Sequence, residues 1–225
     1  MLKTSFIAMA AAACLAILSY TPGTEAHVGL RSPCPRYGAF AGCPAPPKGQ
    51  AIDYDINSPI GTNDHIGAPI CKHTVPASKR QTGQTIKTEY SIGASHGGGH
   101  CQYALSYDNG KTWVVIKTVI RDCLKGTVAS SKYSVDVKIP ASAPSGNAIF
   151  MWLWNNAVGN RELYSNCVDI KINGKNGGQI KGPAPLIANY GPKSAYIGEF
   201  PNANQPDGSD LFSKRKTVTI KVAKK

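Results

Sequence analysis

The sequence predicts an all-β protein, an antiparallel β-sandwich of the immunoglobulin or fibronectin III type with long loops and three disulfides. Three observations lead to this fold class. From Thr85 onward, short runs of alternating apolar and polar residues are separated by turn residues. Glycine and proline are abundant, at 23 and 16 of 225 residues, and no stretch shows sustained helical periodicity with caps. The chain after residue 26 holds an even set of six cysteines, which suits disulfides.

The alternating runs place the strands in order along the chain. In the first run, Ile86, Tyr90 and Ile92 alternate with polar residues, so one face of this strand is predicted to be buried. In the last run, Val218 and Ile220 alternate with polar residues. This predicts an edge strand whose lysines oppose aggregation, or else a basic tail that binds the cell wall. The predicted strands cover residues 86–92, 101–107, 113–119, 133–139, 148–154, 168–172 and 217–222.

Two long segments, 27–80 and 175–210, are rich in loop residues and lack a clear period. Loops of this length are usually functional surfaces or disordered. Cysteines anchor the first segment, which we therefore expect to be ordered against the sandwich. The second segment contains no cysteine, and we expect part of it to be mobile.

Residues 1–26 have the features of a secretory signal peptide. Lys3 supplies a positive start, an apolar run covers 6–18, and Ala26 is the small residue that signal peptidase prefers. Cleavage after Ala26 would leave residues 27–225, which we expect to be one secreted domain. We also expect a monomer that has no membrane contact once the signal is removed.

Secretion makes disulfides the expected state of the cysteines. Six cysteines allow many pairings, so their order alone does not choose among them. The preferred pairing closes one local loop, bridges one hairpin and ties two distant segments together. A thiolate zinc site is the alternative, although the sequence has no CxxC pair. The preferred pairs are Cys34–Cys43, Cys101–Cys123 and Cys71–Cys167.

The formal net charge of +12 favours attraction to acidic polymers. A cationic protein that binds acidic wall polymers is therefore one functional alternative. The basic residues are scattered rather than clustered, and a secreted protein has little access to nucleic acid. We accordingly expect no nucleic-acid partner.

A local motif at residues 106–113 (SYDNGKTW) matches the Asp-box of sialidase-type propellers. A propeller needs several copies at a fixed period, and this chain has one. The motif therefore predicts a single tight turn in which Asp108 accepts hydrogen bonds, Gly110 has a positive φ and Trp113 packs beneath.

His27 would become the first residue of the mature chain. An N-terminal histidine offers its α-amine and its ring Nδ1 to the same metal ion, and the amine loses its proton easily near neutral pH. Nitrogen ligands in a planar arrangement suit copper. The alternative is that histidine follows the cleavage site by chance.

A third nitrogen could come from the glycine-rich stretch that begins at His96 and ends at His100. The three glycines between them allow an unusual backbone path and leave space for a ligand. His96 is the preferred ligand, and His100 is a weaker candidate beside it. His65 and His73 are predicted to be surface or hydrogen-bonding residues.

A Trp-rich run ends in an Asn/Gly turn that is followed by Arg161, Glu162 and Tyr164. Glu162 and Tyr164 would share one face of an extended segment. Beside a metal, the carboxylate could handle protons and the phenol could take an axial position. The alternative is a surface pair of Arg161 with Glu162 and a core tyrosine.

Taken together, these features resemble the fungal chitin-active lytic polysaccharide monooxygenases of auxiliary activity family 11. The resemblance is carried by His27 after a signal peptide, by residues 94–102 (ASHGGGHCQ) and by residues 159–167 (GNRELYSNC). Weaker similarities run through most of the mature chain. His100, Ser165 and the Cys34/Cys43 pair depart from the family pattern.

The resemblance implies a histidine brace that holds one copper ion. His27 would bind through its amine and ring, His96 would supply the third nitrogen, and Tyr164 would be the axial phenol. Ala94 would pack at the open axial face. Glu162 would be a carboxylate behind the ligands, with Arg161 beside it.

The activity implied by the resemblance is oxidative cleavage of chitin or a related β-linked polysaccharide. It needs an external electron donor and peroxide or oxygen as co-substrate. The alternative is a secreted copper-binding or cell-wall polysaccharide-binding protein without oxidative turnover. Paired acidic residues of the kind that hydrolases use are not evident.

Overall fold

The computed structural model describes residues 27–74, 76, 80–82 and 84–223. The predicted signal peptide lies outside the described residues. The elements in chain order are β1 (His27–Ser32), β2 (Gly61–Thr62), β3 (Arg80–Thr82), β4 (Thr85–Ala94), β5 (Gly99–Ser106), β6 (Val114–Cys123), β7 (Ser134–Lys138), β8 (Gly146–Asn156), β9 (Glu162–Ile172), β10 (Gln179–Pro183), α1 (Ser209–Ser213) and β11 (Thr217–Lys221).

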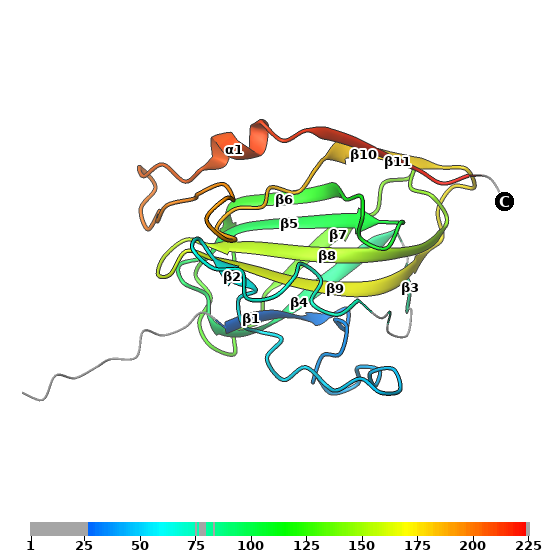
Figure 1. The fold of residues 1–225 in the computed structure, drawn as a ribbon, viewed down its shortest axis with the longest axis horizontal. Coiled ribbons are helices and arrows are strands. Elements are labelled where there is room, and N and C mark those ends of the chain that lie inside the picture. Colours follow the sequence, from blue (N-terminus) through cyan, green and yellow to red (C-terminus); the bar gives the residue numbers. More distant parts are fainter. Residues whose placement is uncertain (1–26, 75, 77–79, 83, 224–225) are drawn as a thin grey trace, which may run out of the picture.

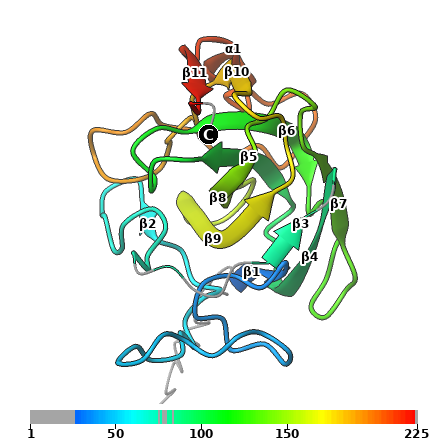
Figure 2. The same ribbon diagram turned by 90° about the vertical axis from the view of Figure 1, so that its right-hand side faces the viewer.

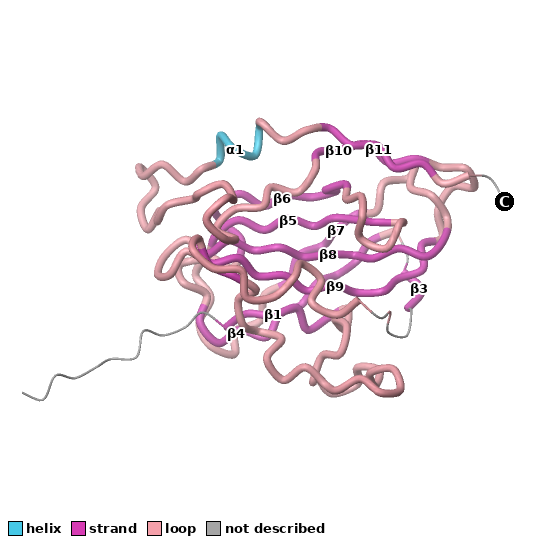
Figure 3. The backbone as a smooth tube through the Cα atoms, in the orientation of Figure 1, coloured by secondary structure: helices cyan, strands magenta, loops and turns pink. Residues whose placement is uncertain are grey.

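Two sheets face each other, and the predicted β-sandwich is confirmed (Figures 1 and 3). One sheet has the order β1-β4-β7, and the other has the order β2-β9-β8-β5-β6. Pairing is antiparallel except where β3 joins β9 in parallel. A ribbon of β10 and β11 lies beyond β6, at the top of Figure 1.

The two long central strands, β8 and β9, are buried on both faces. Phe150 and Trp152 of β8 point into the main core between the sheets, whereas Ile149 and Met151 point to the outer face. Apolar side chains from the loops, including Ile60 and Ile187, cover that outer face. This explains why residues 148–154 are a continuous apolar run rather than an alternating one.

The two segments expected to be irregular both contain strands. Residues 27–80 include β1, where Val28 and Leu30 are fully buried against β4. Residues 175–210 include β10, which pairs along its whole length with β11. The expectation of two irregular segments is therefore wrong at these places. β1 contributes only Val28 and Leu30 to the core and β10 only Ile180, too few for a period to stand out in the sequence.

The three disulfides join the pairs that the sequence favoured: Cys34–Cys43, Cys71–Cys167 and Cys101–Cys123. The turn at 106–113 is also as predicted. Asp108 Oδ1 accepts hydrogen bonds from Ser106 Oγ and Thr112 N, both at 2.8 Å, and Gly110 has a φ of 84°.

Candidate metal centre

The candidate ligands lie at the end of the sandwich where β1 begins, on the left in Figure 1. His27, the first residue of β1, is paired with Ala94, the last residue of β4. His96 follows two residues later in the turn between β4 and β5. Sheet pairing therefore brings His27 and His96, which are distant in sequence, to the same end of the molecule.

One ring nitrogen of His96 has a fixed hydrogen-bond partner, and the other has none among the described residues. Nδ1 lies 2.8 Å from the carbonyl oxygen of Val158. A carbonyl only accepts, so in the neutral ring Nδ1 carries the proton and Nε2 keeps its lone pair. Nε2 is one of three buried side-chain polar atoms without a hydrogen-bond partner among the described residues. A metal-binding histidine has this arrangement, because its second nitrogen is normally held by a carbonyl or carboxylate.

Gly159 allows the His96 ring to lie where it does. A Cβ at this position would be 2.4 Å from His96 Nδ1, and the backbone there has a φ of +91°. The motif at residues 159–167 contains Gly159 but does not reveal this role, since the close approach joins residues more than sixty positions apart. The neighbouring Val158 carbonyl was missed for the same reason.

Arg161 organises the turn that carries Val158 and Gly159. Its guanidinium donates to the carbonyl oxygens of Gly159, Asn156 and Gly198 at 2.8–3.1 Å. The predicted alternative of a surface Arg161–Glu162 pair is not what forms, because both residues are buried and Arg161 binds main-chain carbonyls. Its nearest carboxylate is that of Glu199 at 3.8 Å.

Glu162 and Tyr164 share one face of β9, as expected from their spacing. The Tyr164 hydroxyl donates to Glu162 Oε2 at 2.9 Å, and Asn156 Nδ2 donates to the same oxygen at 3.3 Å. Burial raises the pKa of the Glu162 carboxyl, while the Tyr164 hydrogen bond and the nearby His96 ring oppose this rise. The result is a buried carboxyl next to His96 that can hold a proton more readily than an exposed one.

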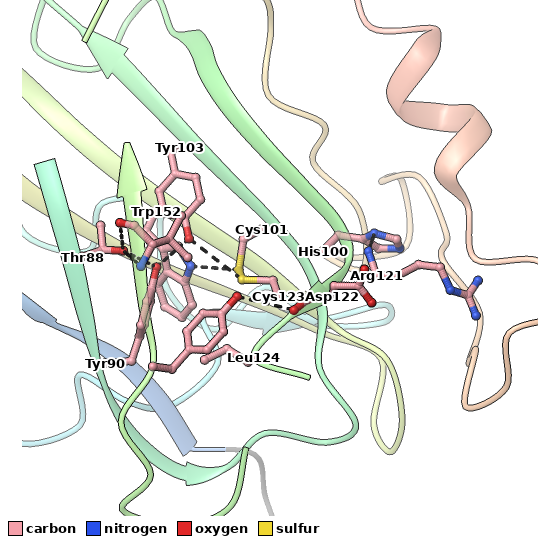
Figure 4. Close-up of a disulfide and its surroundings, with 12 residues drawn as sticks. Thr88, Tyr90, His100, Cys101, Tyr103, Arg121, Asp122, Cys123, Leu124 and Trp152 are labelled. Atoms are coloured by element: carbon pink, nitrogen blue, oxygen red, sulfur yellow. Dashed lines mark hydrogen bonds between the residues drawn. A yellow bond between two sulfur atoms is a disulfide. The ribbon is translucent and has the colours of Figure 1, made fainter. Parts of the chain in front are cut away.

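His100 is a structural residue, and its candidacy as a ligand is not supported. Its Nδ1 accepts from the Arg121 main-chain N–H at 3.1 Å, and its Nε2 donates to the Asp207 carbonyl at 2.8 Å. Phe200 and Phe212 pack on the ring. Figure 4 shows His100 and Arg121 side by side, beyond the Cys101–Cys123 bridge. His100 therefore fastens the segment around residue 207 to the sandwich.

This fastening predicts a pH dependence of stability. Burial lowers the pKa of His100 from 6.5, with Arg121 adding to the effect and Asp207 opposing it. Above the pKa that His100 has in the unfolded chain, its neutral ring stabilises the fold. This contribution is lost as pH falls through that pKa and then through the lower pKa of His100 in the folded state. Between about pH 7 and about pH 5, urea denaturation should show the free energy of unfolding falling more steeply in the wild type than in His100→Gln.

The control for this experiment is His65→Gln, since His65 is exposed. This variant should keep the wild-type slope of unfolding free energy against pH. Equal slopes in the wild type and His100→Gln would contradict the prediction.

His65 and His73 behave as predicted for hydrogen-bonding or surface residues. His73 Nε2 lies 2.7 Å from Asp53 Oδ2 and its ring packs on Tyr37, while His65 is exposed. Within the described ranges, no three His, Cys, Asp or Glu side chains gather to form a metal site. A copper site here therefore needs a main-chain nitrogen, which the α-amine of His27 would provide after cleavage.

The sequence of the chain is similar to those of known proteins. The chain is 39% identical over 157 residues to an AA11 family lytic polysaccharide monooxygenase A of Aspergillus fumigatus, covering 68% of this chain and 67% of the relative. The chain belongs to the AA11 family of lytic polysaccharide monooxygenases. This AA11 chain is therefore a copper-dependent oxidoreductase of that class. No family model matches the sequence.

Two longer relatives agree with this assignment. AA11 monooxygenases from A. fumigatus and A. oryzae are each 29% identical, over 160 and 136 residues. The two matches include 66% and 52% of the AA11 chain. They include only 36% and 32% of the relatives, so the chain spans about a third of the length of each.

The similarity to solved structures is low. A cellulose-active polysaccharide monooxygenase from M. thermophila has a TM-score of 0.48 at 15% identity, covering 77% of this chain and 90% of the other. A Jonesia denitrificans lytic polysaccharide monooxygenase has a TM-score of 0.44 at 17% identity, covering 65% and 100%. The family assignment rests on the sequence relatives.

The residues of the AA11 chain fit copper. The partnerless Nε2 of His96 is buried, its ring is oriented by a carbonyl, and a buried carboxyl lies behind it. Nitrogen donors suit Cu(II), which has the highest affinity in the divalent series. Over the described part of the chain, no helix is long and apolar enough to span a membrane.

Proposed function

We propose that this AA11 chain cleaves chitin oxidatively with one copper ion held by His27 and His96. His27 would bind through its α-amine and ring, and His96 would bind through Nε2. The observation that carries this proposal is the buried Nε2 of His96, which has no hydrogen-bond partner among the described residues while Nδ1 is fixed. The pairing of His27 with Ala94 supports it.

Each neighbouring residue has a role in this proposal. The Val158 carbonyl keeps the proton on Nδ1 of His96, so that Nε2 presents its lone pair. Tyr164 donates a hydrogen bond to Glu162 Oε2, and its phenol oxygen would be a further candidate to hold the copper. The Glu162 carboxyl would hold or release a proton near His96, and Ala94 lies beside His27 as its partner in the sheet. Arg161 keeps the turn at 156–161 in place.

When bound, the copper would supply one-electron oxidative chemistry on the polysaccharide, with an external electron donor and oxygen or peroxide as co-substrate. The chain's contribution is an oriented set of ligands. Glu162 is 2% exposed and Tyr164 is 1% exposed, so these two side chains are shielded from bulk water, whereas His27 and His96 are half-buried. We propose that the enzyme is secreted, works as a monomer and acts on chitin or a related β-linked polysaccharide.

The test uses protein that begins at His27, loaded with one copper and incubated with chitin and ascorbate. Mass spectrometry should find oligosaccharides with one oxidised end. A copper-free sample and a protein extended by Ala26, which blocks the amine of His27, should both give none. Copper binding without oxidised products from chitin or other glycans would instead support a copper-binding or wall-binding protein without turnover.

A further inference from the structure

A loop far from the candidate metal centre has an exposed apolar surface. Tyr54 is 83% exposed, more than any other large hydrophobic side chain of the described residues, and Ile52 is 42% exposed. Both line a hollow of about 440 Å³ together with Phe40, Pro44 and Pro46. All five residues belong to residues 38–54, which we call the 38–54 loop.

The 38–54 loop is ordered by contacts at its base. The Cys34–Cys43 disulfide closes its first half, and Gly38 forms a β-bridge with Asp53. The Asp53 carboxylate lies 3.1 Å from Lys72 Nζ and 2.7 Å from His73 Nε2. A partner that binds the loop therefore meets a surface already in place and pays little ordering entropy.

The chemistry of the hollow indicates what kind of partner it fits. No charged side chain lines the hollow, although the chain carries a formal net charge of +12. An acidic polymer would find no cation there, so a neutral partner is favoured. Tyrosine is suited to such a partner because it offers a flat apolar ring and a hydroxyl at little entropic cost. A neutral β-linked polysaccharide presents the matching combination of apolar C–H faces and hydroxyls.

We propose that the 38–54 loop is a second polysaccharide-binding surface, separate from the candidate metal centre, with Tyr54 as its main contact. The proposal rests on the proposed function only for the identity of the polymer, chitin. In Figures 1 and 2 the loop projects from the bottom of the molecule, whereas β1 begins at the left end in Figure 1. A polysaccharide chain held by the 38–54 loop would leave the end where β1 begins uncovered. It would also keep the enzyme close to its substrate.

The experiment measures binding of copper-free protein to insoluble chitin by depletion isotherms. Tyr54→Ala should weaken binding about fivefold, the size of one aromatic contact. Tyr54→Phe keeps the ring and should bind within about twofold of the wild type. Lys48→Gln changes a charge in the same loop without touching the hollow and should also leave chitin binding unchanged.

Several results would overturn the proposal. Wild-type binding by Tyr54→Ala would show that the ring is not a contact, and equal losses in Tyr54→Ala and Lys48→Gln would show diffuse electrostatic attraction. Tyr54-dependent binding to polygalacturonate rather than chitin would overturn the neutral partner. Chitin binding is measured without copper, so Tyr54-dependent binding by a protein that forms no oxidised products once it is loaded with copper would reject the proposed function and retain this one.

Discussion

Replacing His96 with alanine is expected to lower the affinity for Cu(II) by at least about a hundredfold, since losing a ligand costs more than losing a residue that only orients one. The α-amine and ring of His27 would remain as a two-nitrogen site. Isothermal titration of copper into protein that begins at His27 measures the change. An affinity equal to that of the wild type would reject the histidine brace.

The same substitution should have little effect on the stability of copper-free protein. Nε2 of His96 is buried without a partner among the described residues, so its removal relieves a desolvation cost. The Val158 carbonyl keeps a second donor, Asn156 Nδ2, at 3.0 Å. We expect the free energy of unfolding to change by about 1 kcal/mol, whereas copper binding collapses. His65→Ala, at an exposed position, should change neither quantity.

Gly159→Ala is expected to destabilise the fold by about 2–5 kcal/mol, from a left-handed backbone and an overpacked contact together. The added Cβ would lie 2.4 Å from His96 Nδ1, so the ring must move away from the Val158 carbonyl. Copper affinity should fall about tenfold or more, because that carbonyl orients the ligand. Urea denaturation and copper titration check the two effects.

Gly49→Ala is the matched control for this substitution. Gly49 has a φ of +84°, close to the +91° of Gly159, but an added Cβ would have no neighbour within 4 Å. It should therefore cost only about 1–2 kcal/mol for the backbone and leave copper affinity unchanged. If both variants lost stability equally and kept their copper affinity, the close approach of Gly159 to His96 would have no role.

The strands of the sandwich were largely predictable from sequence. Alternation located β4 and β7, since an exposed and a buried face give a period of two. It also located β5, although that strand is buried along its whole length. β1 was missed because only Val28 and Leu30 carry its pattern, and β10 was missed because its burial depends on pairing with β11. A run of alternating apolar and polar residues indicates which side chains are buried, but it does not indicate which distant strand covers them.

The candidate centre was predictable as a set of residues but not as a geometry. The sequence motifs selected His27, His96, Glu162 and Tyr164, and the structure brings Tyr164 to 2.9 Å from Glu162. The sequence ranked His100 below His96 as a ligand but did not reveal its role, which is to fasten the segment around residue 207 through both ring nitrogens.

The sequence by itself determined the all-β class, the favoured cysteine pairs and the residue types able to hold copper. These depend on local periodicity, on cysteine chemistry and on the donor atoms of single side chains. Only the tertiary structure decided which nitrogen of His96 is available, and that Arg161 binds carbonyls rather than Glu162. Both outcomes depend on contacts between residues of different strands and turns. The register of β8 with β9 and the lack of a Cβ at Gly159 set the distances of these contacts, and local sequence does not encode such distances.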